Sequence, residues 1–525
     1  MSQAVSTAWP DRVDLLVIGG GITGAGIALE AARRGVAVLL VEARDFASGT
    51  SSRSSKLVHG GLRYLASGRF GLTRESVRER RQLLHDAPGL VEPLRFLMGH
   101  YRGHPPGPRK LAAGLALYDF FNGARTRRFH AAADMAQWAP CLQRPGLLGG
   151  SSHQEATTDD ARLVMRVLHE ACHHGARIAN HVAATDVLRE QGRVCGARLQ
   201  PAGGAGTHAV QARCVINATG TWADALRGQL GEAPRLRPLR GSHLLLPLWR
   251  LPVAQAITLL HPRDRRPVFA FPWEGMALVG TTDLDHASPL SEAPAITAAE
   301  AAYLMEALHF AFPTLRLTLA DVVSTYAGVR PVVAGGAADP SREARDHVVL
   351  HEQGLVTVTG GKLTTFRAIA LDALRQVARH VPALAQLAIH PDRHATIFDE
   401  VPPSARLAPL STPLRQRLLG RYGRHADALV ACARPGELEP VPGTRTLWAE
   451  LRWAARSEWV RHLDDLLLRR TRLGLLLRDG AQALLPQLRP LCVAELGWDD
   501  AQWQAECQHY REIIVRDHSV PGSFL

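Results

Sequence analysis

Three glycines near the start of the chain, Gly19, Gly21 and Gly24, have the spacing of a turn that binds the pyrophosphate of a dinucleotide. The first glycine permits a tight turn, the second lets the backbone approach the phosphates, and the third allows a helix to pack closely on a strand. Glu42 follows where an acidic side chain can accept hydrogen bonds from ribose hydroxyls. The pattern predicts a dinucleotide-binding site.

The elements that must position this turn are also readable. The apolar run 15–18 predicts a buried strand, 22–34 a helix that Gly35 ends, and 36–41 a second buried strand. The glycines therefore lie between a strand and a helix, where free N–H groups and the helix dipole favour a bound phosphate.

A loop rich in small hydroxyl side chains, 48–55, follows Glu42 directly and must run along the cofactor. Its continuation to residue 64 combines cations, a histidine and the pair Gly60–Gly61, which permits the backbone to lie against a flat ring. Residues 215–220 predict a strand that ends in a glycine turn, a second edge of the same pocket.

Farther on, segment 239–282 has short apolar runs broken by Pro and Gly, which predict an antiparallel sheet over the cofactor. His243 begins one of its strands, and on sequence alone a structural role is the commoner one for such a histidine. Arg330 and Arg345 could grip a phosphate with two guanidinium forks, although arginines in so arginine-rich a chain usually lie on the surface. Lys362 stands at a predicted helix start, after a strand and two glycines.

Seven segments stand in one characteristic order: GGGITGAGIA, TSSRSSKLVHGGLRYL, INATGTWAD, GSHLLLP, FPWEGMALVGTTD, YAGVRP and TGGKLTTFR. Together they resemble the FAD-dependent glycerol-3-phosphate dehydrogenases, within the larger family that includes glycine oxidase and D-amino-acid oxidase. The resemblance runs from about residue 14 to 367 and, more loosely, through the C-terminal region. The segment SSKLVHGGLRYL is specific to the glycerol-3-phosphate enzymes, whereas the glycine turn is shared by all.

The resemblance implies a mixed α/β fold, with a Rossmann-like FAD-binding domain, an antiparallel β substrate domain and a C-terminal helical domain. It implies oxidation of sn-glycerol 3-phosphate to dihydroxyacetone phosphate, with hydride transfer to flavin N5 and electrons passed to a membrane quinone. His243 would be the base, Arg63 and Lys362 would stabilise the developing alkoxide, Arg330 and Arg345 would hold the phosphate, and Tyr64 and Thr282 would contact substrate. The implied cofactor contacts are Gly19, Gly21, Gly24, Glu42, Thr50, Ser51, Ser54, Ser55, Lys56, Leu57, His59, Gly60, Gly61, Ala184, Gly220, Gly361, Lys362, Leu363 and Thr364. No metal is expected.

One departure from the family concerns the strand before residue 159. The family usually has a Tyr and an Asp there, whereas this chain has His153 and Glu155. A related phosphorylated polyol therefore stays open as the preferred substrate. Asp159 should cap the helix that follows.

The resulting division alternates between two domains. We expect FAD-binding parts at 1–80, 151–238 and 336–385, and substrate parts at 81–150 and 239–335. A Pro-rich linker at 386–412 then leads to a helical domain at 413–525. Within the region 78–145 we expect helices near 78–84 and 111–121 with an irregular stretch at 95–111, either a simple insertion or a path towards a lipid-facing surface.

The formal net charge of +12 fits either a solvated surface or attraction to anionic lipid. The arginine-rich C-terminal helices fit equally a compact cap and a membrane-docking face. Only three lysines occur, Lys56, Lys110 and Lys362, which marks two motif positions where lysine is retained. Scattered cysteines and the lack of a long apolar run predict a cytoplasmic protein, peripheral on the inner membrane face. The sequence leaves the oligomeric state open, with a homodimer as one alternative.

Three other functions stay open. A glycerol-3-phosphate oxidase would hand electrons to oxygen, and an amine or 2-hydroxy-acid oxidase would need a carboxylate-binding arginine instead of two for phosphate. An RNA-associated flavoprotein is prompted by the basic charge, but no aromatic and basic stripe supports nucleic-acid binding. A nicotinamide enzyme would leave the segment SSKLVHGG unexplained.

Overall fold

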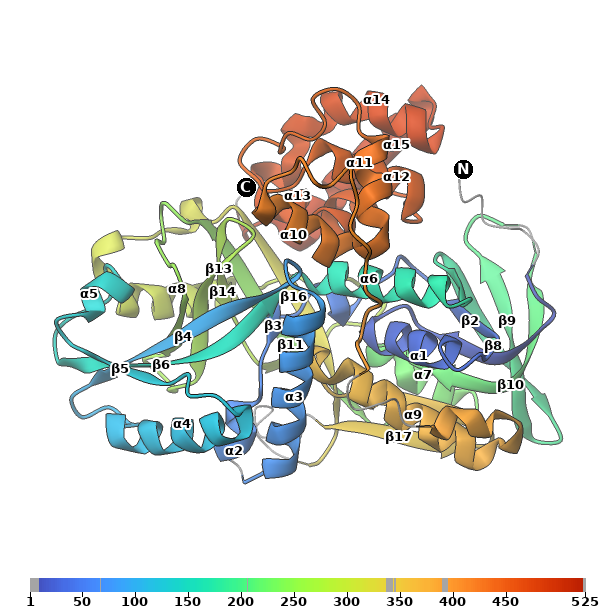
Figure 1. Cartoon of the computed structure of the whole chain (residues 1–525), viewed down its shortest axis with the longest axis horizontal. Helices are drawn as coiled ribbons and strands as arrows, with labels where there is room; N and C mark the ends of the chain where they lie inside the picture. Colours follow the sequence, from blue (N-terminus) through green and yellow to red (C-terminus); the bar gives the residue numbers. More distant parts are fainter. Residues whose placement is uncertain are drawn as a thin grey trace.

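Two β-sheets lie side by side, and a helical C-terminal region sits over their junction (Figure 1). The computed structural model describes residues 9–66, 68–204, 206–336, 343, 346–389 and 395–522, except for the side chains of Arg63 and Ala66. Within these residues, no helix is both long enough and apolar enough to cross a bilayer.

The first sheet is built around the predicted glycine turn. Its main path is β17-β18-β10-β1-β2-β7, parallel except for β17, and β9 and β8 extend it in antiparallel fashion from β10. The strands are β1 (Arg12–Ile18), β2 (Val38–Val41), β7 (Arg177–Ala179), β8 (Val182–Glu190), β9 (Arg193–Pro201), β10 (His208–Asn217), β17 (His347–Glu352) and β18 (Leu355–Gly360).

Helix α1 (Ile22–Ala32) packs against α6 (Asp160–His173) and α9 (Phe366–His380) beside this sheet. The short α7 (Ala223–Gly228) follows β10. The predicted strand, helix and strand are confirmed, but β1 begins earlier than expected because Arg12 pairs with Gln211 of β10. Asp159 caps α6 as predicted, its carboxylate accepting a hydrogen bond from the Arg162 N–H.

The second sheet is mostly antiparallel, with the path β15-β11-β14-β13-β12-β4-β6-β3. Strand β16 pairs with β11 and β5 with β6, and only β12 and β4 run parallel. The strands are β3 (Leu57–Val58), β4 (Val91–Tyr101), β5 (Arg128–Ala131), β6 (Leu147–Thr158), β11 (Leu236–Pro247), β12 (Ala256–Leu260), β13 (Pro267–Trp273), β14 (Met276–Gly280), β15 (Leu284–Asp285) and β16 (Ser324–Val333). The mixed α/β fold class is confirmed.

One expectation for this sheet was wrong. Residues 95–101, predicted to be irregular, belong to β4, because β6 pairs with that strand along its whole length. The pairing brings in a partner some fifty residues away, which local residue preferences do not reveal. The helices that flank the sheet are α2 (Leu62–Ala66), α3 (Phe70–Asp86), α4 (Pro108–Asn122), α5 (Met135–Trp138) and α8 (Ala298–Ala311).

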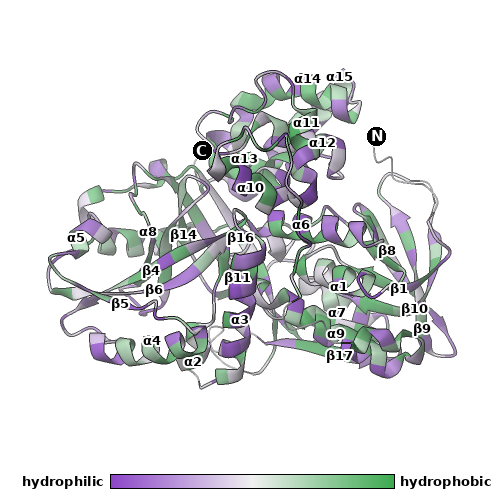
Figure 2. Ribbon diagram, in the orientation of Figure 1, coloured by the Kyte–Doolittle hydropathy of each residue, from purple (hydrophilic) through white to green (hydrophobic). Residues whose placement is uncertain are grey.

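The C-terminal region is helical as predicted, and it shares a hydrophobic core with the second sheet. Its helices are α10 (Thr412–Tyr422), α11 (Ala426–Cys432), α12 (Trp448–Ser457), α13 (Leu473–Leu476), α14 (Leu485–Leu496) and α15 (Asp500–Ile513). Leu467 and Leu473 belong to the same buried cluster as Leu245 of β11 and Phe96 of β4. Figure 2 shows hydrophobic and hydrophilic stretches alternating in these helices, as expected for helices buried on one side. The C-terminal region is therefore packed onto the second sheet.

Candidate active site

The glycine turn leaves no room for side chains, as close approach to a dinucleotide requires. Gly19 has φ +116°, and a Cβ there would overlap the Ala218 carbonyl group. A Cβ on Gly24 would overlap the carbonyl oxygen of Gly19, so only glycine lets α1 lie this close to β1. The start of α1 carries no side-chain cap of its own, and the Ile22 N–H donates to Ser51 Oγ over 3.0 Å. These features fit the pyrophosphate of FAD.

Glu42 directly follows β2, beside the turn. Its carboxylate accepts hydrogen bonds from the Gly20 N–H at 2.7 Å and the Arg44 N–H at 2.9 Å. Burial raises the pKa of Glu42, and the two backbone N–H groups counteract this. The side chain is thereby fixed at the edge of the glycine turn, the place predicted for the ribose.

The hydroxyl-rich loop lies between the second sheet and the helices beside the first sheet, and it contacts both. Thr50 Oγ1 donates to the Val329 carbonyl of β16 at 2.5 Å, and Ser55 Oγ lies 2.9 Å from Nε2 of His243 on β11. Ser54 donates through both its N–H and its hydroxyl to Asp160, at 3.0 and 2.7 Å. The loop thus bridges the domains that were predicted to bind cofactor and substrate.

The Lys56 side chain, directly after this loop, binds other groups of the protein. It is fully buried, and Nζ donates to the Ser52 carbonyl at 2.6 Å and to both Asp160 oxygens at 2.9 and 3.0 Å. Burial lowers the pKa of Lys56 to about 8, although the Asp160 carboxylate acts to raise it. These partners account for Lys56 without the cofactor contact that the sequence predicts for it. Leu57 begins the short strand β3 and is buried.

The Glu155 carboxylate binds the backbone of the glycine pair that follows His59. The Gly60 N–H donates to Glu155 Oε2 at 2.8 Å, and that carboxylate also pairs with Arg80 and accepts from Tyr118 at 2.6 Å. Burial disfavours the Glu155 carboxylate, but Arg80 outweighs this and holds its pKa far below the usual range. The departure from the family at position 155 therefore supports the backbone of the predicted flavin-side loop.

The Lys362 side chain lies beside Gly61. Its Nζ is 3.6 Å from the centroid of the Tyr64 ring, a cation–π contact. Gly360 and Gly361 have φ +79° and +78°, and Thr364 Oγ1 donates to the His59 carbonyl at 3.3 Å. Leu363 begins the helical turn that leads into α9. Lys362, Tyr64 and the 59–61 backbone are thereby brought together, while their predicted roles towards cofactor and substrate stay predictions.

His243 is buried on β11 between Tyr326 of β16 and Gly280 of β14. Only 1% of its surface is exposed, and a Cβ on Gly280 would overlap the imidazole ring. Nε2 contacts Ser55, whereas Nδ1 has no hydrogen-bond partner among the described residues. Burial, helped by the charges of Arg330 and Lys56, holds the pKa of His243 well below its ordinary value. The imidazole is therefore neutral at pH 7, as a general base must be.

Arg330 of β16 lies beside His243, on the same face of the paired strands β11 and β16. Its guanidinium is where a Cβ of Gly241 would be, two residues before His243, and residues two apart share a strand face. It donates to Asp283 Oδ1 at 3.0 Å and to Thr281 Oγ1 at 3.2 Å. Sequence reasoning named Thr282 instead of these two neighbours, because nothing in TTD marks which residue turns towards Arg330.

Thr282 itself is buried within the substrate sheet. Its hydroxyl accepts from the Ser242 N–H at 2.9 Å and donates to Glu300 Oε1 at 2.7 Å. Its role as a substrate contact therefore stays a prediction. The Arg63 side chain and all of Arg345 lie outside the described residues, so their predicted roles are carried by the sequence alone.

Two predicted contacts lie at the other edges of the cofactor pocket. Ala184 belongs to β8, and Gly220 follows β10 with φ +61° and accepts from Thr359 Oγ1 of β18 at 3.3 Å. Ala184 therefore lies in the first sheet, and Gly220 lies just after one of its strands.

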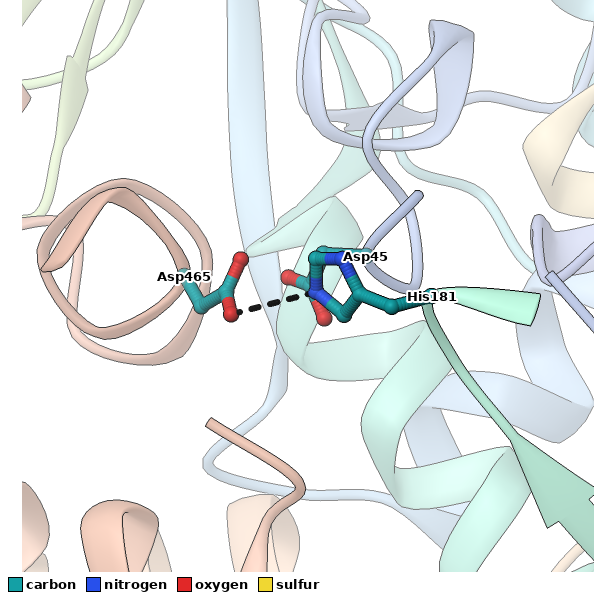
Figure 3. A group of neighbouring side chains, drawn as sticks. All are labelled: Asp45, His181 and Asp465. Atoms are coloured by element: carbon teal, nitrogen blue, oxygen red, sulfur yellow. Dashed lines mark ion pairs between the residues drawn. The ribbon is translucent and has the colours of Figure 1, made fainter. Parts of the chain in front are cut away.

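The arginines of the segment LRRTR are buried, so they do not form part of a membrane-docking face. Arg470 donates to both oxygens of Asp45 at 2.7 Å, and Arg472 donates to Asp159 at 2.9 Å and to Asp160. Figure 3 shows Asp465, three residues before this segment, beside His181 and Asp45. Because Arg469 and Arg470 already neutralise these carboxylates, the group is an ion-pair cluster that ties the C-terminal region to the first sheet.

Comparisons with known proteins agree with this geometry. Residues 14–367 match the family model described as FAD dependent oxidoreductase, and residues 375–503 match the C-terminal domain of alpha-glycerophosphate oxidase. The chain is 36% identical over 519 residues to the glycerol-3-phosphate dehydrogenase of Mycobacterium leprae, covering 94% of this chain and 88% of that protein. It is 33% identical over 483 residues to the aerobic glycerol-3-phosphate dehydrogenase of Staphylococcus saprophyticus, covering 87% and 86% of the two chains.

A solved structure extends the similarity. The glycerol-3-phosphate dehydrogenase of Bacillus halodurans, complexed with FAD, superposes with a TM-score of 0.75 at 28% identity, covering 95% of this chain and 94% of that one. The similarity spans both sheets and the C-terminal helices. The chain thus belongs to the FAD-dependent glycerol-3-phosphate dehydrogenases, within the FAD dependent oxidoreductase family.

Proposed function

We propose that this chain oxidises sn-glycerol 3-phosphate to dihydroxyacetone phosphate and passes the electrons to a membrane quinone. The observation that carries the proposal is the placement of Arg330 and His243 on one face of the paired strands β11 and β16. A phosphate-binding cation beside a buried neutral imidazole suits a substrate with a phosphate at one end and a hydroxyl to be deprotonated. The names of the similar proteins support the same substrate.

Each residue then has a defined task. Arg330, with Arg345, holds the phosphate bidentately and fixes the position of C2. His243 removes the proton of the C2 hydroxyl, and Lys362 with Arg63 stabilises the negative charge that develops on that oxygen. Bound FAD supplies the acceptor for the hydride that leaves C2. Tyr64 orders Lys362 through the cation–π contact.

An anaerobic titration tests this function. The purified protein, loaded with FAD, should lose its visible flavin absorbance when glycerol 3-phosphate is added without oxygen. The reduced enzyme should then regain its colour with a short-chain quinone. An unchanged spectrum with glycerol 3-phosphate would reject the substrate, and amino acids and 2-hydroxy acids would be tried next.

An oxygen-using glycerol-3-phosphate oxidase is the second candidate. It is favoured by the match of residues 375–503 to the C-terminal domain of alpha-glycerophosphate oxidase. Peroxide formed in air as fast as quinone is reduced would support the oxidase, and slow reoxidation in air would support the dehydrogenase. Sedimentation of the same sample tests for a homodimer.

We place the membrane-facing surface on α3 and α4. Phe70, Leu117 and Phe120 are 49%, 40% and 78% exposed; Phe121 stacks on Phe70 and makes an edge-to-face contact with Phe120. Exposed cations flank these side chains: Arg74, Arg109, Lys110 and Arg125. Exposed apolar side chains with basic neighbours are typical of a surface that binds anionic bilayers. In Figure 1 this surface lies at the opposite end of the molecule from the C-terminal helices.

Vesicle sedimentation tests this surface. The Phe120→Asp protein should no longer bind vesicles of mixed anionic and neutral lipid, while flavin reduction by soluble substrate stays intact. Trp249→Asp is the matched control, because Trp249 is 77% exposed but lies in the turn after β11. Equal loss in both variants, or retention in both, would reject α3 and α4 as the docking surface.

A further inference from the structure

Asp160 is a buried carboxylate on which two separate parts of the chain converge. It is the first residue of α6 and is fully buried. Its oxygens accept hydrogen bonds from loop 52–56, through Ser54 and Lys56, and from Arg472 of the C-terminal region. The expected function uses none of these contacts directly.

All three guanidinium nitrogens of Arg472 donate hydrogen bonds around Asp160. Nε donates to Asp159 at 2.9 Å, one terminal nitrogen donates to Asp160, and the other donates to the Ser52 carbonyl at 3.3 Å and the Leu468 carbonyl at 2.8 Å. The planar fork therefore spans the helix α6, the loop and its own segment at once, which the single ammonium of a lysine does not reproduce. The C-terminal region thereby reaches the loop that faces the cofactor.

Lys56 carries the connection from Asp160 to His243. Its Nζ lies 4.6 Å from the centroid of the Tyr326 ring, and the Tyr326 hydroxyl donates to the Ser54 carbonyl at 2.8 Å. Tyr326 in turn stacks on His243, and Ser55, between Ser54 and Lys56, contacts His243 Nε2. Every step from Arg472 to His243 is a direct contact between buried or partly buried groups.

We propose that Asp160 is a positioning residue: together with Arg472 it fixes loop 52–56, and through Ser55 and Tyr326 it sets the orientation of His243. The C-terminal region then contributes to the reaction through Arg472, although it supplies no residue to the predicted substrate pocket. This inference rests on the proposed role of His243.

The chain offers a matched control for a purely stabilising effect. Arg162 of α6 and Glu458 of the C-terminal region form an equally buried pair, with both terminal nitrogens donating at 2.8 Å. It joins the same helix to the same region, but within the part of the chain that the structure describes neither side chain has a hydrogen bond or ion pair with loop 52–56. Glu458→Gln therefore breaks a comparable bridge without touching the loop.

The first test uses the full-length apoprotein and needs no substrate. Hydrogen–deuterium exchange should be faster in peptides covering 50–58 in Asp160→Asn than in the wild type, because the Ser54 N–H loses its charged acceptor. Glu458→Gln should leave exchange in 50–58 unchanged. Unchanged exchange in Asp160→Asn would overturn the proposal, as would the same increase in Glu458→Gln.

The second test uses the FAD-loaded enzyme under anaerobic stopped-flow conditions. Asp160→Asn should slow flavin reduction at saturating glycerol 3-phosphate by about tenfold or more, since small displacements of reacting groups are costly. The substrate dissociation constant should stay within about threefold, because the side-chain contacts of Asp160 are with Ser54, Lys56 and Arg472 and not with the predicted phosphate-binding Arg330. Glu458→Gln should change neither value, and equal slowing in both variants would overturn the proposal.

A milder variant keeps the inference testable if Asp160→Asn does not fold. Arg472→Lys retains the charge but loses the fork, and it should shift exchange in 50–58 and the reduction rate in the same direction as Asp160→Asn. Wild-type values in Arg472→Lys would then overturn the proposal. If the wild type itself is not reduced by glycerol 3-phosphate, the proposed function fails while the exchange result still decides how the loop is positioned.

Discussion

The imidazole of His243 stacks on the ring of Tyr326, with centroids 4.5 Å apart and planes inclined by 13°. The two residues face each other across strands β11 and β16, where they are register partners. The stack and the Ser55 contact fix the ring, and they leave Nδ1 as a buried nitrogen without a partner among the described residues. A neutral ring held in this way is prepared to accept a proton.

Replacement of this histidine should affect rate more than binding. We expect His243→Ala to slow flavin reduction by about 10²-fold or more, the range for loss of a general base, with little change in substrate affinity. Stopped-flow reduction at several substrate concentrations separates the two. His261→Ala is the control, because His261, directly after β12, is also buried and stacks on Tyr303 of α8 with ring centroids 3.6 Å apart. Reduction at the wild-type rate would remove His243 from the role of base.

The pH dependence of reduction should reflect the lowered pKa of His243. A base is active when deprotonated, so activity falls as the pH drops through its pKa. Because burial holds that pKa well below the ordinary value, the acidic limb of flavin reduction should lie below about pH 6.5, the unperturbed value for histidine. Rates measured from acidic to neutral pH check this. A midpoint at or above the ordinary value would contradict the neutral, buried imidazole.

Loss of Arg330 should weaken binding of the phosphate. A hydrogen bond to a charged group contributes about 1.5–3 kcal/mol, so Arg330→Met should weaken glycerol 3-phosphate binding by roughly 10- to 150-fold. Inhibition by inorganic phosphate should weaken in parallel, while reduction by unphosphorylated glycerol, however slow, should stay unchanged. Unaltered inhibition by phosphate would show that Arg330 serves only its Asp283 and Thr281 partners.

A methyl group at Gly24 should abolish cofactor binding. The Cβ of Gly24→Ala would overlap the Gly19 carbonyl oxygen, which forces α1 away from β1 and opens the phosphate turn. The bound flavin-to-protein ratio after incubation with FAD measures the effect. Gly114→Ala in α4 is the control: a Cβ there meets no atom within 4 Å, and alanine in a helix adds up to about 1 kcal/mol of stability. Full flavin loading in Gly24→Ala would contradict the close packing.

The stability of the C-terminal region should fall at alkaline pH through His462. Its Nδ1 lies 2.8 Å from Glu506 Oε1, and this hydrogen bond raises the pKa of His462 to about 9. A raised native pKa means that the stabilisation is complete below the unfolded value of about 6.5 and is lost as the pH rises through 9.

A melting series between these pH values checks this. At pH 6 the wild type should have a higher melting temperature than His462→Gln, and this difference should shrink steadily towards pH 9 and above. The change in the difference should be modest, because the His462 side chain is 41% exposed. A difference independent of pH would show that the Glu506 pair is not ionic.

Some of this protein could be predicted from local sequence. The turn at Gly19–Gly24, the strand and helix around it and the cap at Asp159 follow from spacing, because a turn's backbone angles and a helix period depend on neighbouring residues. The resemblance added the motif order, and with it the expected FAD, the substrate and the place of His243.

Only the tertiary structure decided which charges face solvent. From sequence, the arginines around residue 470 fitted a membrane face as well as a buried cap, but Arg472 meets Asp159 across 313 residues of chain and both are buried. Likewise Lys56 meets Asp160, and Glu155 holds Gly60. Local patterns report period and backbone geometry, whereas an ion pair depends on where distant strands and helices return. Sequence therefore determined the cofactor turn, and the folded chain determined how it is supported.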